Sequence, residues 1–322
     1  MELKNIAKIV KKGKNIAICG HVAPDMDCLG SVFSLKVALE SLGKHVDAFA
    51  DKGMPEKDKR VFKRELSEEL DCSNYDLIIM VDTPNEQRLG KYGSNVVKHN
   101  NIVLIDHHRG NPCEITQQEF VDSSSSSCAE ICCKLIELLG VEITPEIATY
   151  LYAGIAGDTN CFLNDNTTTN SFLEAAKLNE LGANKVLVNE VIFKSNTLDD
   201  WELDKKVYET AELFDNFGIV FIRYKDLKKF KGDVTGTSRY ANKLVYLESI
   251  QIGCSVTERN LNTFDCSFRS KKAVDVNVLA RKLGGGGHIN ASGCVLTGKY
   301  KQVREKLITA IKETLKEQGY ND

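Results

Sequence analysis

Short runs of apolar residues recur along the first third of the chain, and helical patterns separate them. The runs comprise Asn15–Cys19 and residues 46–50, 76–81 and 102–105. Runs this short and continuously apolar are typical of strands that are buried on both faces of a parallel sheet. Residues 31–42 have the period of a helix that Gly43 ends, whereas residues 20–30 have the composition of a polar turn. Strands that alternate with helices predict an α/β domain.

Helical patterns dominate the middle of the chain, and a different mixture follows. The helical segments are Cys128–Leu139 and residues 144–157, 170–181 and 184–215. From Gly218 onwards the pattern predicts strands at residues 218–223, 250–257 and 264–269, and helices at residues 276–283 and 301–317. We therefore expect a smaller α+β domain. The predicted organisation is a first domain over residues 1–190, a helical connection over residues 191–215 and a second domain over residues 216–322, because 322 residues exceed what one core usually holds.

The charge of the chain is nearly balanced, with 42 Lys and Arg against 45 Asp and Glu. A protein that binds long duplex nucleic acid usually needs a basic surface, so we exclude that function and retain small anions and very short oligonucleotides. The N-terminal segment lacks the long apolar core of an export signal, and no apolar stretch is long enough for a transmembrane helix. The 11 cysteines include no Cys-x-x-Cys pair, so we expect mostly buried or free thiols in a reducing cytoplasm rather than a zinc site.

Carboxylates and imidazoles follow three of the predicted strands. They are His21, Asp25 and Asp27 after the first strand, Asp82 at the end of the second, and Asp106, His107 and His108 after the third. Because ligands bind at the carboxyl ends of strands in open parallel sheets, we expect these side chains to gather at one edge. A fourth group, Asp158, ends an apolar helical segment. Clustered carboxylates repel one another unless cations neutralise them, and mixed oxygen and nitrogen donors suit Mn²⁺, Fe²⁺, Co²⁺ or Zn²⁺ better than Ca²⁺.

The order and spacing of these motifs resemble the DHH phosphoesterase superfamily. The motifs are His-x-x-Pro-Asp-x-Asp-x-x-Gly-Ser from His21, Val-Asp at Asp82, Asp-His-His from Asp106, Gly-Asp-Thr around Asp158 and Gly-Gly-Gly-Gly-His-x-x-Ala-Ser-Gly from Gly284. The last motif resembles the signature of the DHH-associated C-terminal domain. Length and layout are similar to the nanoRNase type, which comprises bifunctional oligoribonucleases and 3'-phosphoadenosine 5'-phosphate phosphatases. The resemblance implies a Rossmann-like parallel-sheet DHH domain and a smaller C-terminal domain, with the active site in the cleft between them.

The resemblance also implies a site for two divalent ions, typically Mn²⁺. The ligands of one ion would be His21, Asp25 and Asp82, and those of the other would be Asp27, Asp82, His107 and Asp158. Asp82 would bridge the ions, Asp106 would orient the histidines, and His108 would face the scissile phosphate, which makes these three the candidate catalytic residues. Two such ions activate a water for in-line attack on phosphorus. Because side chains alternate along an extended chain, we expect His107 and His108 to point apart.

The glycine-rich motif is the candidate substrate-binding segment. Four consecutive glycines are unfavourable inside a helix or a strand, so the segment is either a flexible linker or a loop whose backbone N–H groups approach an anion. The resemblance implies the second interpretation, in which the substrate phosphate is bound by Gly285, Gly286, Gly287, His288 and Ser292. Arg269 is either a further contact to the terminal phosphate or a base, or an ordinary solvated arginine. A small second domain of this kind predicts dinucleotides or short oligomers as substrates.

Two stretches leave alternatives open or depart from the family pattern. Residues 123–127 are five serines before a helix, which suit either a flexible loop or anion binding at the helix N-terminus. In nanoRNase-like sequences Gly-Asp-Thr is commonly followed by Gly, an aromatic and a basic residue, but here residues 160–163 are Asn-Cys-Phe-Leu. The missing basic residue removes one expected phosphate contact and leaves the exact substrate open. Met26 and Cys28 replace small residues of the first motif, while the ligands themselves are intact.

The function predicted from these observations is a manganese-dependent phosphodiesterase that acts on short linear oligonucleotides or dinucleotides such as pApA, with phosphatase activity on 3'-phosphoadenosine 5'-phosphate. Direct hydrolysis of cyclic dinucleotides is an alternative. Hydrolysis of pyrophosphate or polyphosphate is a further alternative, although family II pyrophosphatases lack the glycine-histidine segment. A nucleotide sensor with an inactive metal site would require degenerate ligands, and no expected ligand is missing. The expected partners are short RNA, a dinucleotide or a nucleoside bisphosphate. A homodimer is compatible with the sequence.

Overall fold

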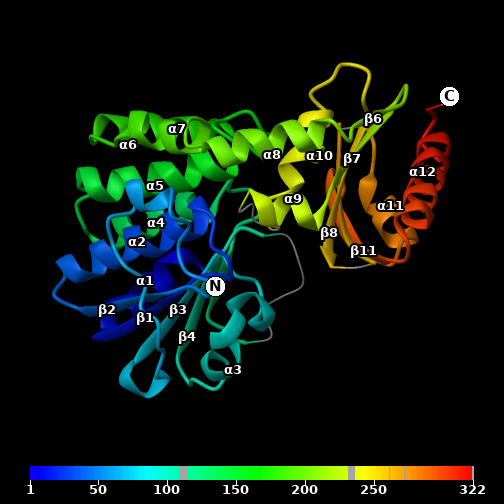
Figure 1. The fold of residues 1–322 in the computed structure, drawn as a ribbon. Helices are drawn as coiled ribbons and strands as arrows, with labels where there is room; N and C mark the ends of the chain where they lie inside the picture. Colours follow the sequence, from blue (N-terminus) through cyan, green and yellow to red (C-terminus); the bar gives the residue numbers. More distant parts are fainter. Residues whose placement is uncertain (109–114, 231–235, 261, 272, 321–322) are drawn as a thin grey trace. The chain divides into compact units, whose positions relative to one another are not determined.

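The computed structural model describes the chain except residues 109–114, 231–235, 261, 272 and 321–322 (Figure 1). The described residues form two compact units, Met1–Ser195 and Asn196–Asp322. Each unit has its own sheet and its own hydrophobic core. Among the described residues, no helix is both long and apolar enough to cross a membrane.

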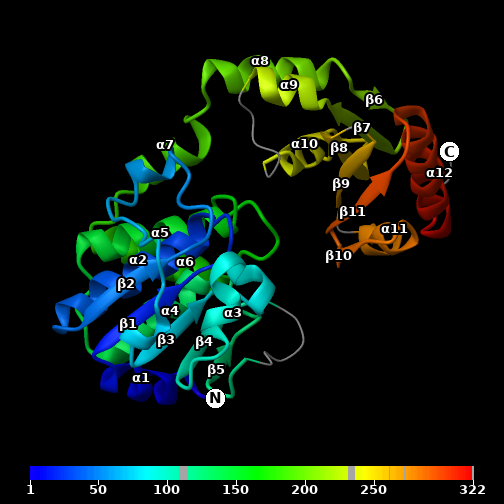
Figure 2. The same cartoon turned by 60° about the horizontal axis from the view of Figure 1, so that its bottom comes forward.

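An entirely parallel sheet of five strands forms the centre of the first unit. Its strands follow the order β2 (His45–Phe49), β1 (Asn15–Cys19), β3 (Leu77–Val81), β4 (Ile102–Asp106) and β5 (Glu119–Val121), and they lie side by side in Figure 2. Every residue of β3 and β4 is buried, which explains their continuously apolar sequences. The predicted parallel sheet is confirmed. Its chain order reverses around β1, the kind of position at which open α/β sheets bind ligands.

Three helices, α2 (Met26–Ser41), α4 (Cys128–Leu139) and α5 (Pro145–Asp158), cover one face of this sheet (Figure 1). The opposite face packs against α3 (Gly93–Val96) and the 3₁₀ segment Glu86–Tyr92. Helices α2 and α5 cross so closely at Gly30 that a Cβ on this residue would lie 2.5 Å from the carbonyl oxygen of Tyr150. A Cβ on Gly157 would lie 2.7 Å from the Cβ of Met26, so the start of α2 meets the end of α5.

Helix α2 begins at Met26, and the prediction of a polar turn over residues 20–30 is therefore wrong in its second half. Asp25 is the N-cap, and its Oδ1 accepts the backbone N–H groups of Asp27 and Cys28 at 3.0 and 3.1 Å. Aspartates and small residues favour turns as well as helix starts, so composition alone did not separate the two.

The region predicted as one helical stretch over residues 184–215 divides into several elements. It contains α7 (Lys185–Phe193), α8 (Leu198–Tyr208) and the short strand β6 (Glu212–Leu213). The two units separate at Ser195, between α7 and α8. The remaining helices of the first unit are α1 (Leu3–Lys12), whose Ile6 and Val10 are buried, and α6 (Thr169–Glu180).

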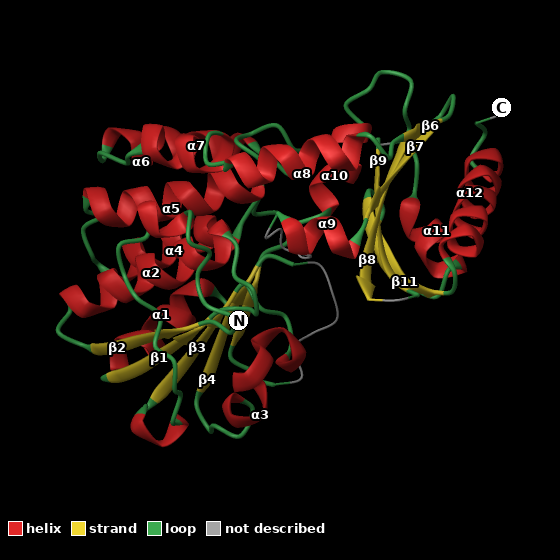
Figure 3. Cartoon of the chain, in the orientation of Figure 1, coloured by secondary structure: helices red, strands yellow, loops and turns green. Residues whose placement is uncertain are grey.

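A mixed sheet of six strands forms the second unit and confirms the predicted smaller α+β domain. Its strands follow the order β10 (Gly286–His288), β11 (Ala291–Thr297), β9 (Thr263–Ser270), β8 (Ile252–Asn260), β7 (Phe217–Ile222) and β6. β7 and β8 are parallel, and the other pairs are antiparallel. Helices α11 (Val276–Lys282) and α12 (Tyr300–Glu317) cover one face (Figure 3). The smaller helices α9 (Tyr224–Lys229) and α10 (Ser238–Leu244) belong to a separate apolar cluster with β7.

The glycine-rich segment contains a strand, so the prediction that it is a linker or loop is wrong. Gly286–His288 forms the edge strand β10, in which Gly286 pairs with Gly293 and His288 pairs with Ala291. Gly287 has φ of +148°, and a Cβ on it would lie 2.6 Å from the carbonyl oxygen of Ala291. The glycine therefore serves a close approach of two strands that a larger residue would block.

Candidate metal centre

Three of the predicted ligands follow adjacent strands of the first unit, β1, β3 and β4. His21 comes shortly after β1, Asp82 directly follows β3, and His107 directly follows β4. Because these strands are parallel neighbours, the three side chains meet at the carboxyl edge of the sheet. Asp82 has φ of 54°, a left-handed conformation that costs a non-glycine residue about 1 kcal/mol or more and occurs often at functional sites.

His21 forms the first group of candidate ligands with Asp25 and Asp82. Its Nε2 lies 3.4 Å from Asp82 Oδ2 and 3.7 Å from Asp25 Oδ2. Its Nδ1 lies 3.0 Å from the carbonyl oxygen of Val22. When Nδ1–H donates to that carbonyl, the lone pair on Nε2 faces the two carboxylates and is available to a metal ion.

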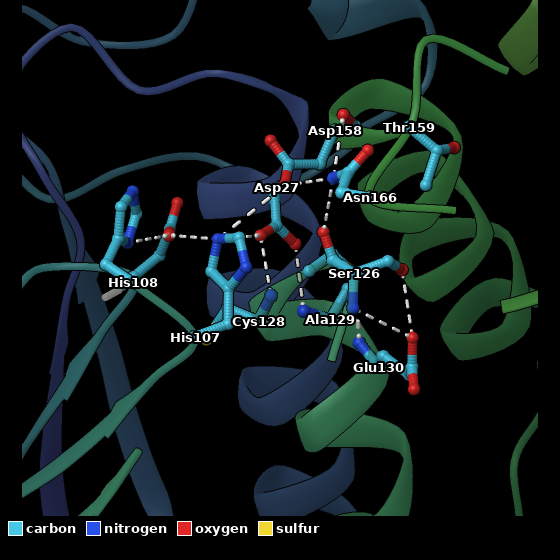
Figure 4. Close-up of polar contacts among 12 residues, drawn as sticks. Asp27, His107, His108, Ser126, Cys128, Ala129, Glu130, Asp158, Thr159 and Asn166 are labelled. Atoms are coloured by element: carbon cyan, nitrogen blue, oxygen red, sulfur yellow. Dashed lines mark hydrogen bonds and ion pairs between the residues drawn. The ribbon is translucent and has the colours of Figure 1, made fainter. Parts of the chain in front are cut away.

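His107 forms the second group with three carboxylates. Its Nε2 lies 3.6 Å from Asp158 Oδ2 and 3.7 Å from Asp27 Oδ2 (Figure 4). It also lies 3.6 Å from Asp82 Oδ1. Asp27 comes from the first turn of α2, and Asp158 is the last residue of α5. The close crossing of these two helices therefore brings both carboxylates to the strand ends.

Asp82 is shared by the two groups, since Oδ2 faces His21 and Oδ1 faces His107. Oδ1 is buried and accepts no hydrogen bond from the part of the chain that the structure describes. A buried carboxylate oxygen without a donor is unfavourable unless a cation lies beside it. The two sets of oxygen and nitrogen donors, joined by one carboxylate, fit a pair of divalent ions.

The electrostatics of the carboxylates agree with a cation site. Burial, followed by the negative charges of Asp82, Asp158 and Asp25, raises the pKa of Asp27 well above its ordinary value. Burial likewise raises the pKa of Asp82. It also raises the pKa of Asp158 to about 6, although His107 acts in the opposite direction. A divalent cation beside these carboxylates would stabilise their ionised forms, which burial and mutual repulsion disfavour.

Asp106 holds both neighbouring histidines. Its Oδ1 accepts the backbone N–H groups of His107 at 2.8 Å and His108 at 3.3 Å, and it lies 2.8 Å from His108 Nδ1. Strand β4 ends at Asp106, and the two rings lie side by side with centroids 4.6 Å apart (Figure 4). The expectation that the two side chains point apart is therefore wrong, because alternation does not extend beyond the strand. With Nδ1 of His108 bonded to Asp106, its Nε2 remains for a substrate.

The serine run precedes α4, whose first backbone N–H groups bind an internal anion. Ser127 is the N-cap, and its Oγ accepts the N–H of Glu130 at 3.2 Å. Asp27 accepts the N–H groups of Cys128 at 2.7 Å and Ala129 at 2.8 Å (Figure 4). The anion at this helix N-terminus is thus the carboxylate of Asp27, and the positive end of the helix dipole stabilises its charge.

The departure from the family pattern after Asp158 lies in an unusual turn. Asn160, Cys161 and Phe162 have φ of 48°, 52° and 69°, which are left-handed values. The position at which the family commonly has glycine is thus one that needs this conformation, and asparagine tolerates it better than other residues. Thr159 supports the turn, since its Oγ1 donates to the carbonyl of Ile155 at 2.6 Å and accepts the N–H of Phe162 at 3.1 Å.

Two residues beside the centre were not predicted as functional. Cys28 is fully buried, and its sulfur lies within 4.8 Å of ligand atoms of His21 and Asp82, so the three side chains could hold one ion together. Its position in the first turn of α2, directly after Asp25 and Asp27, was the available sequence signal. Asn166 contacts Asp158 from a loop, and nothing in the local sequence distinguishes it from a surface asparagine.

In the second unit, two of the predicted substrate contacts lie in one row of the sheet. His288 pairs with Ala291, which pairs with Arg269 on the next strand. Directly paired residues of antiparallel strands point to the same face, so His288 and Arg269 flank the small side chain of Ala291. Burial without a carboxylate partner among the described residues lowers the pKa of Arg269, which suits a cation that receives an anionic ligand.

Ser292 differs from these two residues in its surroundings. It is 6% exposed, and its Oγ donates to the carbonyl of His288 at 2.6 Å. The hydroxyl therefore fixes the turn between β10 and β11, on the opposite face from His288. Of the predicted glycines, a Cβ on Gly286 would meet no atom closer than 3.9 Å, whereas a Cβ on Gly285 would lie 2.1 Å from the carbonyl oxygen of Gly293.

Comparison with protein families matches both units of the chain. Residues 15–155 match the family described as "DHH family, N-terminal domain". Residues 221–317 match the "DHHA1 domain". The first match contains the ligand groups at the strand ends up to His107, and the second contains Arg269 and the glycine-rich segment.

Curated relatives and solved structures resemble the chain over almost its whole length. The bifunctional oligoribonuclease and PAP phosphatase NrnA of Thermus thermophilus is 30% identical over 99% of this chain and 96% of that protein. The cyclic-di-AMP phosphodiesterase GdpP of Bacillus subtilis is 29% identical over 96% of this chain but only 49% of that protein. The crystal structure of an exopolyphosphatase-related protein from Bacteroides fragilis has a TM-score of 0.89 at 21% identity, covering 98% of this chain and 97% of that one. This last likeness concerns the fold alone.

Proposed function

Because this chain belongs to the DHH family of phosphoesterases, which are metal-dependent hydrolases, we propose that it cleaves short linear oligonucleotides and dinucleotides such as pApA. We further propose that it removes a phosphate from 3'-phosphoadenosine 5'-phosphate. The observation that carries this proposal is that one carboxylate oxygen of Asp82 faces His21 and the other faces His107. A single buried carboxylate with one oxygen toward each group suits a pair of ions that lie close together, as in two-metal hydrolases.

In the proposed site, His21, Asp25 and Asp82 hold one ion, and the second ion is held by Asp27, Asp82, His107 and Asp158. Manganese is the proposed metal, since mixed imidazole and carboxylate donors suit it better than Ca²⁺. Two such ions supply activation of a water and neutralisation of charge on the phosphoryl oxygens. Asp106 orients both histidines, and its hydrogen bond to Nδ1 raises the pKa of His108. The protonated His108 ring donates through Nε2 to a phosphoryl oxygen, where charge develops in the transition state.

The proposed substrate contacts in the second unit are Arg269, His288 and the glycines beside it. A guanidinium and an imidazole on one face of the sheet, separated by a small residue, provide room for a phosphate group. A site of this size holds a dinucleotide or a short oligomer, and the near-neutral charge of the chain argues against long nucleic acid. The predicted active site between the two domains remains part of this proposal. The ten described cysteines are free thiols, which agrees with the cytoplasmic location that we propose.

Direct hydrolysis of cyclic dinucleotides is the second candidate function. GdpP, named for cyclic-di-AMP phosphodiesterase activity, is nearly as similar to this chain as NrnA. This chain spans only about half of GdpP, however, so the similarity does not extend to the rest of that protein.

The two candidates are separated by incubating the purified protein and Mn²⁺ with a panel of substrates. The panel contains pApA, RNAs of about two to ten nucleotides, 3'-phosphoadenosine 5'-phosphate and cyclic-di-AMP, with products resolved by chromatography over time. We expect rapid cleavage of pApA and the shortest RNAs and slow or no cleavage of cyclic-di-AMP. Intact pApA, RNA and bisphosphate would contradict the proposal, and preferential cleavage of cyclic-di-AMP would favour the second candidate.

A further inference from the structure

Asn166 connects the end of α5 to the segment before α4. Its Nδ2 lies 3.0 Å from the carbonyl oxygen of Ser126, 3.3 Å from the carbonyl oxygen of Asp158 and 3.4 Å from Asp158 Oδ2 (Figure 4). All three partners are acceptors, so the nitrogen of the amide rather than its oxygen must face them. The amide has two N–H groups for these three acceptors, which are the carbonyl oxygens of Ser126 and Asp158 and the Oδ2 of Asp158.

The carbonyl that anchors Asn166 is itself held in place. Ser126 is 1% exposed, and its N–H and Oγ donate to Glu130 Oε2 at 3.2 and 2.9 Å. Glu130 is also 1% exposed and accepts further hydrogen bonds from Asn170 and from Ser171 at the start of α6. A buried carboxylate with this many donors rigidly joins α4 to α6, so Ser126 offers Asn166 a fixed acceptor.

The loop that carries Asn166 is constrained at both of its ends. It begins with the left-handed turn Asn160, Cys161 and Phe162, supported by Thr159. It ends at Thr168, which forms a reciprocal capping box with Ser171. Three consecutive non-glycine residues in left-handed conformation are unfavourable and persist only where the surroundings enforce them. The constrained loop therefore fixes the amide of Asn166 in contact with Asp158.

We propose that Asn166 is a positioning residue for the second ion, which holds Asp158 so that its Oδ2 faces His107 and the metal. The oxygen that Asn166 contacts is the same one that lies 3.6 Å from His107 Nε2. A donor on that oxygen fixes the rotation of the carboxylate, so binding of the ion costs less ordering of the ligand. This inference rests on the proposed function, because it assigns a role within the two-ion site.

Asn164 provides a matched control in the same loop. Its Nδ2 donates to the carbonyl oxygen of Asp158 at 3.1 Å, and no contact to the Asp158 carboxylate is among its hydrogen bonds. Both asparagines thus cap the C-terminus of α5, and only Asn166 also contacts the metal-facing oxygen. A role in capping the helix would make the two residues equivalent, whereas a role in positioning the ligand would make them different.

The test is calorimetric titration of Mn²⁺ into the full-length wild type and the variants Asn166→Ala and Asn164→Ala, with thermal unfolding of the metal-free proteins alongside. We expect Asn166→Ala to lower the affinity for the second Mn²⁺ ion about 10- to 100-fold and to leave the affinity for the first ion unchanged. Asn164→Ala should bind both ions as the wild type does. Hydrolysis of pApA by Asn166→Ala should recover as the Mn²⁺ concentration rises, because affinity for the ion rather than the chemical step is affected.

The inference is overturned if Asn166→Ala binds both ions with wild-type affinity. It is also overturned if Asn164→Ala lowers the affinity for the second ion as much as Asn166→Ala does. A third contradicting result is an equal loss of affinity for both ions in Asn166→Ala together with a large fall in its unfolding temperature. That pattern would report a general loss of structure. If the wild type cleaves pApA and the variants show any of these three patterns, this inference alone is contradicted. A wild type that binds a single ion contradicts the proposed function itself, and the inference with it.

Discussion

His107 Nε2 lies 3.6 Å from Asp82 Oδ1, while the other oxygen of that carboxylate faces His21. The relationship joins two groups of ligands that arrive from different strands and helices. Asp82 is buried and adopts a left-handed backbone conformation, so the fold maintains this geometry against a local cost. The predictions below test this centre, the substrate contacts and the packing that supports them.

Replacing the two adjacent histidines should have different effects. His107→Ala should lose one Mn²⁺ ion and nearly all turnover, because Nε2 of His107 belongs to the second ligand group. His108→Ala should retain both ions and lose about 10²- to 10³-fold in rate, as expected for a group that stabilises transition-state charge. Bound metal is measured by equilibrium dialysis, and rates are measured with pApA.

His45→Ala is the control for these two variants, since His45 is largely exposed and lies at the start of β2. It should keep wild-type metal content and rate. Identical metal content and activity in His107→Ala and the wild type would contradict the ligand assignment.

Removal of Arg269 should impair substrate binding without affecting the metal. A charge-assisted hydrogen bond is worth about 1.5–3 kcal/mol, so Arg269→Ala should raise KM for pApA by about 10- to 100-fold. Arg259→Ala serves as control, because Arg259 lies on the adjacent strand and pairs with Asp265. An unchanged KM in Arg269→Ala, or an equal rise in Arg259→Ala, would rule out the proposed phosphate contact.

The two glycines of strand β10 should respond differently to substitution by alanine. Gly287→Ala forces a Cβ to within 2.6 Å of a carbonyl oxygen and requires φ of +148°, so it should destabilise the protein by about 2 kcal/mol or more. Gly286→Ala meets no atom closer than 3.9 Å and should change stability little. Urea unfolding of both variants checks the difference, and equal stabilities would show that the close approach of β10 and β11 is not needed.

Asp58 should make the stability of the protein depend on pH. Burial raises its pKa from 3.8 to about 6, with Lys57 acting against the shift and Asp25 adding to it. Since the folded state holds this proton more tightly than the unfolded state, its contribution to stability is present below pH 4 and is lost as pH rises through 6. The loss amounts to about 3 kcal/mol, because the pKa rises from 3.8 to about 6 and each pKa unit corresponds to about 1.4 kcal/mol.

Asp58→Asn removes this titration while keeping the shape of the side chain. The difference in unfolding free energy between this variant and the wild type should therefore move in favour of the variant between pH 4 and 7, as measured by urea unfolding at each pH. Parallel stability curves for the two proteins would show that Asp58 ionises normally.

The sequence was sufficient for the sheet of the first unit because its strands are continuously apolar, as β3 and β4 illustrate. The sequence also placed His21, Asp82 and His107 at or just after strand ends, where the structure brings them together, and their role as metal ligands stays a prediction. It was not sufficient for the start of α2 or for strand β10, where capping and close strand packing outweigh composition. The contacts of Asp27 with the N-terminus of α4 and of Asn166 with Asp158 depend on tertiary structure, which no local pattern encodes.

The most direct test of the two-ion centre is electron paramagnetic resonance of the protein loaded with two equivalents of Mn²⁺. Ions bridged by Asp82 would lie about 3.5–4 Å apart, so we expect the spectrum of an exchange-coupled pair. Asp82→Ala should lose this coupled signal. A wild-type spectrum that shows only isolated Mn²⁺ ions, or no bound Mn²⁺, would contradict the proposal that Asp82 joins two metal sites.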